Sequence, residues 1–191
     1  MTDDTTPDPG TPDPDAPEDG PLRLVEAEVQ RLLAAVDAAD FAALIAALGE
    51  HRRWFFTGQG RSGAVAAMAA TRCMHLGATT HLLGEATSPS VQAGDGVLVV
   101  SDSGTTPVSV WFAEKARVEG ASVVAVTGAR DSPLAALART AVVIPDIGSA
   151  QFGGSAFEQG ALLVLDAAML AVQRRQAISD ESMHRRHTNM R

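Results

Sequence analysis

The sequence has few residues that could staple a fold covalently or through a metal, because it contains one cysteine among 191 residues. Cys73 alone cannot form an internal disulfide, and no Cys/His cluster has the spacing of a zinc site. We therefore expect an intracellular protein without a bound metal, stabilised by its hydrophobic core. A chain of this length is expected to form one folded domain, which buries roughly 70% of its unfolded surface.

Long apolar runs and clustered basic residues are also missing. No stretch of 18 apolar residues is present, and the N-terminus is acidic and proline-rich where a secretion signal would be basic and then apolar. One lysine accompanies fourteen arginines, which are scattered rather than arranged in a stripe beside aromatic residues. These absences argue against secretion, a membrane span and nucleic-acid binding, and they favour a cytoplasmic location.

Negative charge is concentrated at the start of the chain. Residues 1–20 hold seven acids, five of the ten prolines and no basic residue, so they carry seven of the eight net negative charges. Such a composition cannot bury apolar surface, and it predicts a disordered, solvating tail. The folded domain is then expected to be nearly neutral and to span residues 21–191.

Apolar periodicity predicts the order of the elements. Residues 22–48 have helical spacing with a break near 37–40, which indicates a helical arm or hairpin. Uniformly apolar strands then alternate with helices, which is typical of a parallel sheet covered on both faces. The predicted strands are 54–57, 79–83, 97–101, 122–127 and 141–145, and the predicted helices are 61–76, 106–119, 132–139 and 155–174. We predict a three-layer α/β fold with five parallel strands, whose ligands bind at the carboxyl ends of the strands.

Two loops at that edge could bind phosphate. Residues 58–63 read Gly-Gln-Gly-Arg-Ser-Gly, and Glu85 follows near the end of the next strand, a pattern that alone would suggest NAD. Residues 101–106 read Ser-Asp-Ser-Gly-Thr-Thr before another helix, where free amides and the helix dipole favour an anion. Simple N-capping by Ser103 or Thr105 is the alternative. The two loops together favour a phosphate monoester over a dinucleotide.

These loops belong to a set of motifs that resembles the sugar isomerase (SIS) domain family, a flavodoxin-like fold with the signature Ser-x-Ser-Gly-x-Thr after the third strand. The resemblance is strongest to its 6-phospho-3-hexuloisomerase branch, and Asp102 stands where the family commonly has glycine. The matching segments are residues 58–63, 72–77, 84–89, 93–95, 101–106, 154–159 and 186–189.

The resemblance implies an enzyme without metal or cofactor that interconverts 3-hexulose 6-phosphate and fructose 6-phosphate through a cis-enediol, in the ribulose monophosphate route of formaldehyde assimilation. It also implies a homo-oligomer, in this family a tetramer. Two other interpretations stay open. The chain could be a SIS module that senses a phosphosugar without converting it, or, less favoured, an NAD-dependent enzyme.

The resemblance makes Glu158 the candidate base. Ser155-x-x-Glu158 is also a capping-box pattern, in which the glutamate would only bind an N-cap amide. His75, the second implied proton-transfer residue, lies about 20 Å along its helix from the ligand edge, so it would have to serve a neighbouring subunit. Its alternative role is to interact with the helix C-terminus.

Arg61 follows the first glycine pair, where its guanidinium could hold phosphate or an enediolate oxygen, or could form an ordinary salt bridge. His187, near the chain end, could be donated to a site or could be a solvated residue. The predicted substrate-binding residues are Gly60, Arg61, Ser62, Glu85, Thr87, Ser101, Ser103, Thr105, Thr106 and His187.

Overall fold

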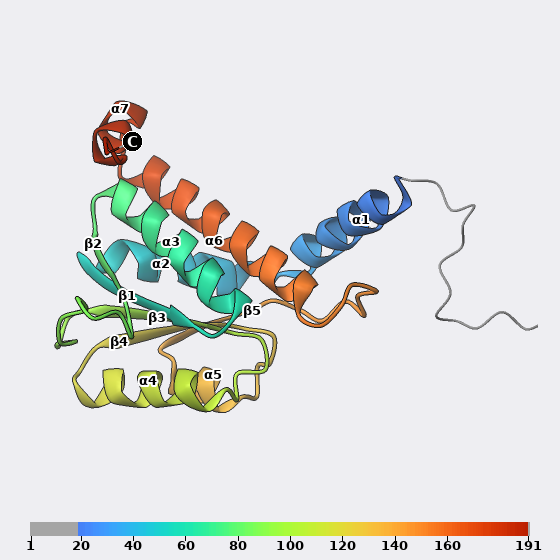
Figure 1. Ribbon diagram of the computed structural model, residues 1–191, viewed down its shortest axis with the longest axis horizontal. Coiled ribbons are helices and arrows are strands. Elements are labelled where there is room, and N and C mark those ends of the chain that lie inside the picture. Colours follow the sequence, from blue (N-terminus) through green and yellow to red (C-terminus); the bar gives the residue numbers. More distant parts are fainter. Residues whose placement is uncertain (1–18, 191) are drawn as a thin grey trace, which may run out of the picture.

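A five-stranded parallel sheet forms the centre of the computed structural model, which describes residues 19–190 (Figure 1). The elements are, in chain order, α1 (Gly20–Ala35), α2 (Ala38–Glu50), β1 (Arg53–Gly58), α3 (Arg61–Leu76), β2 (Thr79–Leu82), β3 (Gly96–Ser101), α4 (Pro107–Val118), β4 (Ser122–Thr127), α5 (Pro133–Leu137), β5 (Thr140–Val143), α6 (Ser155–Arg175) and α7 (Asp180–Arg186). The predicted tail lies outside the described residues apart from Asp19 and Gly20, where α1 begins.

The strand order is β2-β1-β3-β4-β5, with every neighbouring pair parallel. This is the flavodoxin-like order, in which the chain reverses direction across the sheet between β1 and β3. All six residues of β3 are buried, as expected for a central strand that is covered on both faces. The predicted fold class is therefore confirmed.

Alternate residues of β1 serve two separate cores. Trp54 and Phe56 pack with α2, α3 and α6, whereas Phe55 packs on the other face with Val97, Val99 and the helices α4 and α5. Figure 1 shows the same three layers, with α2, α3 and α6 above the sheet and α4 and α5 below it. This burial on both faces explains why the central strands are apolar at successive positions in the sequence.

The predicted break in the N-terminal arm is confirmed at Asp37. Its carboxylate accepts hydrogen bonds from the amides of Ala39 and Asp40 and so caps α2. The preceding helix, α1, projects from the body (Figure 1) and buries only Glu28 and Leu32. The arm is thus attached to the body through few buried residues.

The C-terminal part contains one core helix and one helix that the periodicity did not predict. By length and hydropathy alone α6 could cross a membrane, as could the bent pair α1–α2 taken as one span, but half of the α6 window is buried inside the fold. Its apolar residues are therefore explained by the core that it shares with α2 and α3. The unpredicted helix is α7, which begins at the Ser179 N-cap and has no buried residue. The predicted helix 132–139 is shorter in the structure, where α5 ends at Leu137.

Candidate functional site

The loop after β1 is closed by tight contact between glycines. A Cβ on Gly58 would lie 2.7 Å from the carbonyl group of Ser62, and one on Gly63 would lie 2.8 Å from the Gly58 oxygen. Gly60 has φ +58°, a conformation that side chains disfavour. The strand and the helix therefore meet in a sharp turn, which makes Arg61 the first residue of α3 at the carboxyl edge of the sheet.

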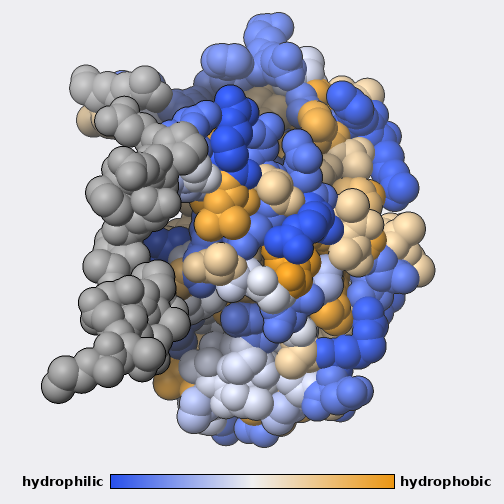
Figure 2. Space-filling view, turned by 90° about the vertical axis from the view of Figure 1, so that its right-hand side faces the viewer, coloured by the Kyte–Doolittle hydropathy of each residue, from blue (hydrophilic) through white to orange (hydrophobic). Residues whose placement is uncertain are grey.

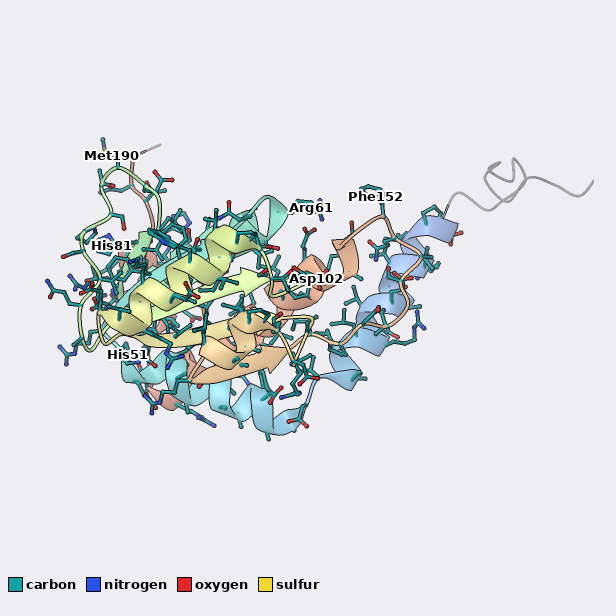
Figure 3. The ribbon with its side chains drawn as sticks, turned by 90° about the horizontal axis from the view of Figure 1, so that it is seen from below. His51, Arg61, His81, Asp102, Phe152 and Met190 are labelled. Atoms are coloured by element: carbon teal, nitrogen blue, oxygen red, sulfur yellow. The ribbon has the colours of Figure 1, made fainter. Side chains whose placement is uncertain are left out.

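Arg61 and Glu158 form an ion pair across this edge, through Nε and Oε2. Figure 3 shows Arg61 and Asp102 at the same end of the sheet. The Arg61 side chain is 68% exposed and the Glu158 side chain only 14%. The structure thus holds a mostly buried carboxylate beside a cation that is largely exposed to solvent. The salt-bridge alternative for Arg61 is also realised, with Glu158 as the partner.

The capping-box alternative for Glu158 is wrong. Gly154, not Ser155, is the N-cap of α6, and the Ser155 hydroxyl donates to the Phe152 carbonyl at 2.8 Å. The Glu158 amide donates to the Gly154 carbonyl within the helix, while the Glu158 carboxylate faces Arg61. The carboxylate is therefore directed towards the edge of the sheet.

In the loop after β3 the hydroxyl groups contact one another. The Ser101 and Thr106 hydroxyls are 3.3 Å apart, and Ser103 Oγ accepts from the Thr105 amide and hydroxyl at 3.3 and 3.0 Å. Neither Ser103 nor Thr105 caps α4, because the N-cap is Thr106 and it makes no side-chain cap bond. The N-capping alternative is therefore wrong, and the hydroxyls of this loop lie beside an uncapped helix N-terminus.

A cavity of about 360 Å³ lies between the loops that follow β3, β4 and β5. Asp102, Gly128, Asp146 and Gly154 are among the residues that line it. Burial, followed by repulsion from Asp146 and Glu158, raises the pKa of the Asp102 carboxyl. Figure 2 faces this end of the molecule, where apolar residues lie in small groups among polar ones. The charged residues that line the cavity, Asp102 and Asp146, are thus both acidic.

Other predicted contact residues lie apart from the ion pair. Glu85 and Thr87 are exposed in the loop after β2, and among the described residues their side chains make no hydrogen bond or ion pair. Ser62 is half-buried in the first turn of α3, beside the exposed Gly60. The structure therefore brings together the loops 58–63, 101–106 and 154–158, and leaves the loop after β2 without a contact to them through these side chains.

His75 and His187 form a second cluster at the opposite end of α3. Their rings stack with centroids 5.1 Å apart and planes 11° apart. They line a cavity of about 370 Å³ together with Arg72 and His184. Burial, then the nearby His187, Arg72 and His184, lowers the pKa of His75. Met190, close to His187 in the chain, lies far from Arg61 in Figure 3, so the predicted residues form two separate groups.

The arm contributes a residue that the sequence did not single out. Glu28, 1% exposed, accepts hydrogen bonds from Ser149 Oγ, the Ala150 amide and Gln151 Nε2 at 2.7 to 2.8 Å. Gln151 and Gln159 exchange side-chain hydrogen bonds of 3.2 and 2.8 Å. A network therefore runs from α1 to the residue after Glu158. An acid on the buried stripe of α1 was the only sequence signal for it.

Another cavity, about 560 Å³, lies at the amino edge of the sheet and is lined by none of the predicted site residues. Cys73 borders it, but burial raises the pKa of this thiol to about 12, so the thiol is not a nucleophile at neutral pH. Within residues 19–190 no group of three or more His, Cys, Asp or Glu side chains could hold a metal ion. The carboxyl edge is therefore the best candidate site.

Comparison with known proteins gives consistent matches. A family model described as SIS domain matches residues 47–170. A 3-hexulose-6-phosphate isomerase of Mycobacterium gastri is 41% identical over 88% of this chain and 89% of its own length. A protein of the same name from Bacillus subtilis is 32% identical over 71% of this chain and 78% of its own.

Among solved structures, a hypothetical protein of Methanococcus jannaschii has a TM-score of 0.79 and 25% identity. The alignment covers 90% of this chain and 99% of that one, and a molecular function of 3-hexulose-6-phosphate isomerase was inferred from that crystal structure.

Proposed function

The chain belongs to the SIS domain family, and on that premise we propose that it is a phosphosugar isomerase that interconverts 3-hexulose 6-phosphate and fructose 6-phosphate. The observation that carries the proposal is the mostly buried Glu158 carboxylate, which faces Arg61 at the carboxyl edge of the sheet. The relatives of that name, which match over most of the chain, support the choice of substrate.

Glu158 acts as the base in this proposal. Starting from fructose 6-phosphate, its carboxylate takes the proton from C3, the C3–H electron pair forms the C2=C3 bond, and negative charge develops on O2. O2 then takes up a proton and the O3 hydroxyl gives one up, so that a cis-enediol forms and its O3 electron pair becomes the C3=O bond. The C2=C3 electron pair takes the returned proton at C2, which gives the 3-ketone. Arg61 lies beside Glu158 and can place its guanidinium against the enediolate oxygen. No metal or cofactor takes part.

The phosphate group binds at the loops 58–63 and 101–106. Both loops precede a helix N-terminus, at α3 and α4, and neither helix has a side-chain cap. Exposed amides and the positive end of the helix dipole favour a phosphate there without a lysine. Ser101, Ser103, Thr105 and Thr106 supply hydroxyl groups next to these amides.

We place a second proton-transfer group in trans. His75 lies at the C-terminal end of α3, about 20 Å along the helix from Arg61, so it reaches a carboxyl-edge site only in another copy of the chain. His187, stacked on His75, would enter that site with it. We therefore propose a homo-oligomer, a tetramer as in the family resemblance, with sites at its interfaces. A cytoplasmic location fits the phosphorylated substrate and the lone, buried Cys73.

The other two interpretations are less well supported. A sensor needs no base, whereas Glu158 is held mostly buried beside a cation. An NAD-dependent enzyme fits the loop 58–63 but has no support among the matching relatives.

Incubation with fructose 6-phosphate in D2O, followed by NMR, tests the proposed reaction. We expect signals of 3-hexulose 6-phosphate and deuterium at C3 of fructose 6-phosphate, with both absent in Glu158→Gln. Deuterium at C1 alone would indicate an aldose–ketose isomerase instead. Binding without any exchange would support the sensor.

Subunit exchange tests the shared site. Glu158→Gln and His75→Asn oligomers should each be nearly inactive and should regain activity once their subunits are mixed, because some interfaces then hold both wild-type groups. Verified mixed oligomers that stay inactive would overturn the trans arrangement while leaving the reaction itself intact.

A further inference from the structure

The Asp102 carboxyl group occupies a slot between two glycines at the carboxyl edge. A Cβ on Gly128 would overlap Asp102 Oδ1, and one on Gly154 would lie 3.2 Å from Asp102 Oδ2 and 3.9 Å from Glu158 Oε1. The absence of side chains at these two positions is what lets the carboxyl group extend to this point. Carboxyl oxygens of Asp102 and Glu158 thus both lie within 4 Å of the position that a Gly154 side chain would occupy.

The oxygens of the Asp102 carboxyl group accept no hydrogen bond from the described part of the chain. Among the described residues no side chain or amide donates a hydrogen bond to it, although its backbone carbonyl accepts from the Gly128 amide and from Thr127 Oγ1. The charged groups around it are Asp146 from the β5–α6 loop and Glu158 from α6, with Arg61 held by Glu158. Asp102 is exposed, so water can donate to this carboxyl group in the free protein. A ligand that displaces this water must donate hydrogen bonds in its place and carry no negative charge there.

The position of Asp102 in the chain indicates which part of a sugar phosphate would contact it. Its backbone belongs to the loop 101–106, where the proposed function places the phosphate, and its carboxyl group approaches the turn that carries the proposed base. In a hexulose 6-phosphate, the groups between the phosphate on C6 and the reacting carbons C2 and C3 are the hydroxyls on C4 and C5.

We propose that Asp102 is a specificity-determining residue, which accepts a hydrogen bond from the substrate hydroxyl on C4 or C5. The inference rests on the proposed function and adds to it the part of the substrate that this residue recognises. It concerns a side chain that the SIS resemblance does not supply, since glycine is common at this position in the family. The names of the relatives support a hexulose 6-phosphate as substrate. Asp102 would make this chain selective for substrates that carry the hydroxyl on C4 or C5.

Deoxy substrates paired with an Asp102 variant test the contact directly. The kcat/KM of fructose 6-phosphate is compared with that of its 4-deoxy, 5-deoxy and 1-deoxy analogues, in the wild type and in Asp102→Ala. In the wild type, loss of the contacted hydroxyl should lower kcat/KM about 10- to 100-fold, as expected for a hydrogen bond to a charged acceptor. In Asp102→Ala that ratio should fall below about threefold. The 1-deoxy ratio should be the same in both proteins.

The controls separate recognition from structure. A merely structural role would lower kcat/KM for all four substrates by one common factor, which would overturn the inference, as would a change confined to the 1-deoxy ratio.

Glu119→Gln removes an exposed carboxylate at the far end of α4 and should leave every ratio unchanged. Asp102→Leu has a similar branched shape without an acceptor and repeats the test if the alanine variant does not fold. A wild type inactive on fructose 6-phosphate would overturn the proposed function, whereas an active wild type with unchanged ratios in the variants would overturn only this inference.

Discussion

Leu32 is the main apolar contact of the α1 arm, and its truncation should be costly. The side chain is 1% exposed and lies over Gly160 of α6, where a Cβ would overlap Leu32 Cδ2 and would lie 2.9 Å from Cδ1. Because Gly160 has no side chain, nothing on that part of α6 fills the space that Leu32→Ala leaves. We expect a loss of about 3–5 kcal/mol in the free energy of unfolding, the upper part of the usual range for such truncations.

A size exchange with Gly160 gives the sharper test. Gly160→Ala alone crowds Leu32 and should cost about 1–3 kcal/mol, partly offset by a gain in helix propensity of about 1 kcal/mol. In the double variant the new methyl group fills part of the space that Leu32 vacates. The double variant should therefore be about 1–2 kcal/mol more stable than the sum of the single changes predicts.

Denaturant unfolding at one fixed protein concentration measures all four proteins. Leu33→Ala is the matched control, because Leu33 is 41% exposed on the same helix, and it should cost less than about 1 kcal/mol. A Leu32→Ala variant within 1 kcal/mol of the wild type, or strictly additive changes in the double variant, would show that Leu32 does not hold the arm against α6.

Three further predictions concern single groups. Glu158→Gln should keep phosphosugar binding and lower kcat about 100-fold or more in a coupled isomerase assay, because an amide cannot accept the carbon-bound proton. Hydrogen bonds from Gln151, Ala150 and Ser149 lower the pKa of Glu28, so the stability that its charge contributes is present above its ordinary value of 4.5 and lost as the pH falls through the folded value. The stability difference between wild type and Glu28→Gln, measured by denaturant unfolding, should therefore shrink as the pH falls below 4.5. A difference that stays constant with pH would contradict a stabilising role of the Glu28 charge. Cys73 should resist iodoacetamide at pH 8 in the native protein and react after unfolding, because burial raises its pKa to about 12.

The fold could be predicted because its signals are local and strong. The central strands β1, β3 and β4 contain short apolar runs. Helix α3 begins and ends at the predicted residues because a glycine turn precedes it and Gly77 follows it in the left-handed conformation. Helix α7 has the opposite character. It has seven residues, none of them buried, so no apolar periodicity marks it in the sequence.

The site could be predicted only in part, because its decisive contacts join distant residues. The loops 58–63 and 101–106 each belong to one strand–turn–helix unit, so their glycines and hydroxyls already indicate a ligand edge in the sequence. The slot for Asp102 depends instead on Gly128 and Gly154, which come from two other loops of the sheet. No local pattern contains that arrangement.

The two interpretations of Glu158 also contrast a local sequence pattern with a contact between distant residues. Ser155-x-x-Glu158 satisfies a local rule for a capping box, but Ser155 is already the first residue of α6 and the N-cap is Gly154. The serine hydroxyl donates to the Phe152 carbonyl instead. Because Ser155 is not the N-cap, Glu158 has no partner with which to form a capping box. Its carboxylate pairs with Arg61, 97 residues away, a contact that exists only because α3 and α6 start at the same edge of the sheet and pack on the same face. Tertiary structure therefore rules out the capping role, and it directs the only acid in the first turn of α6 to the edge where the loops 58–63 and 101–106 converge.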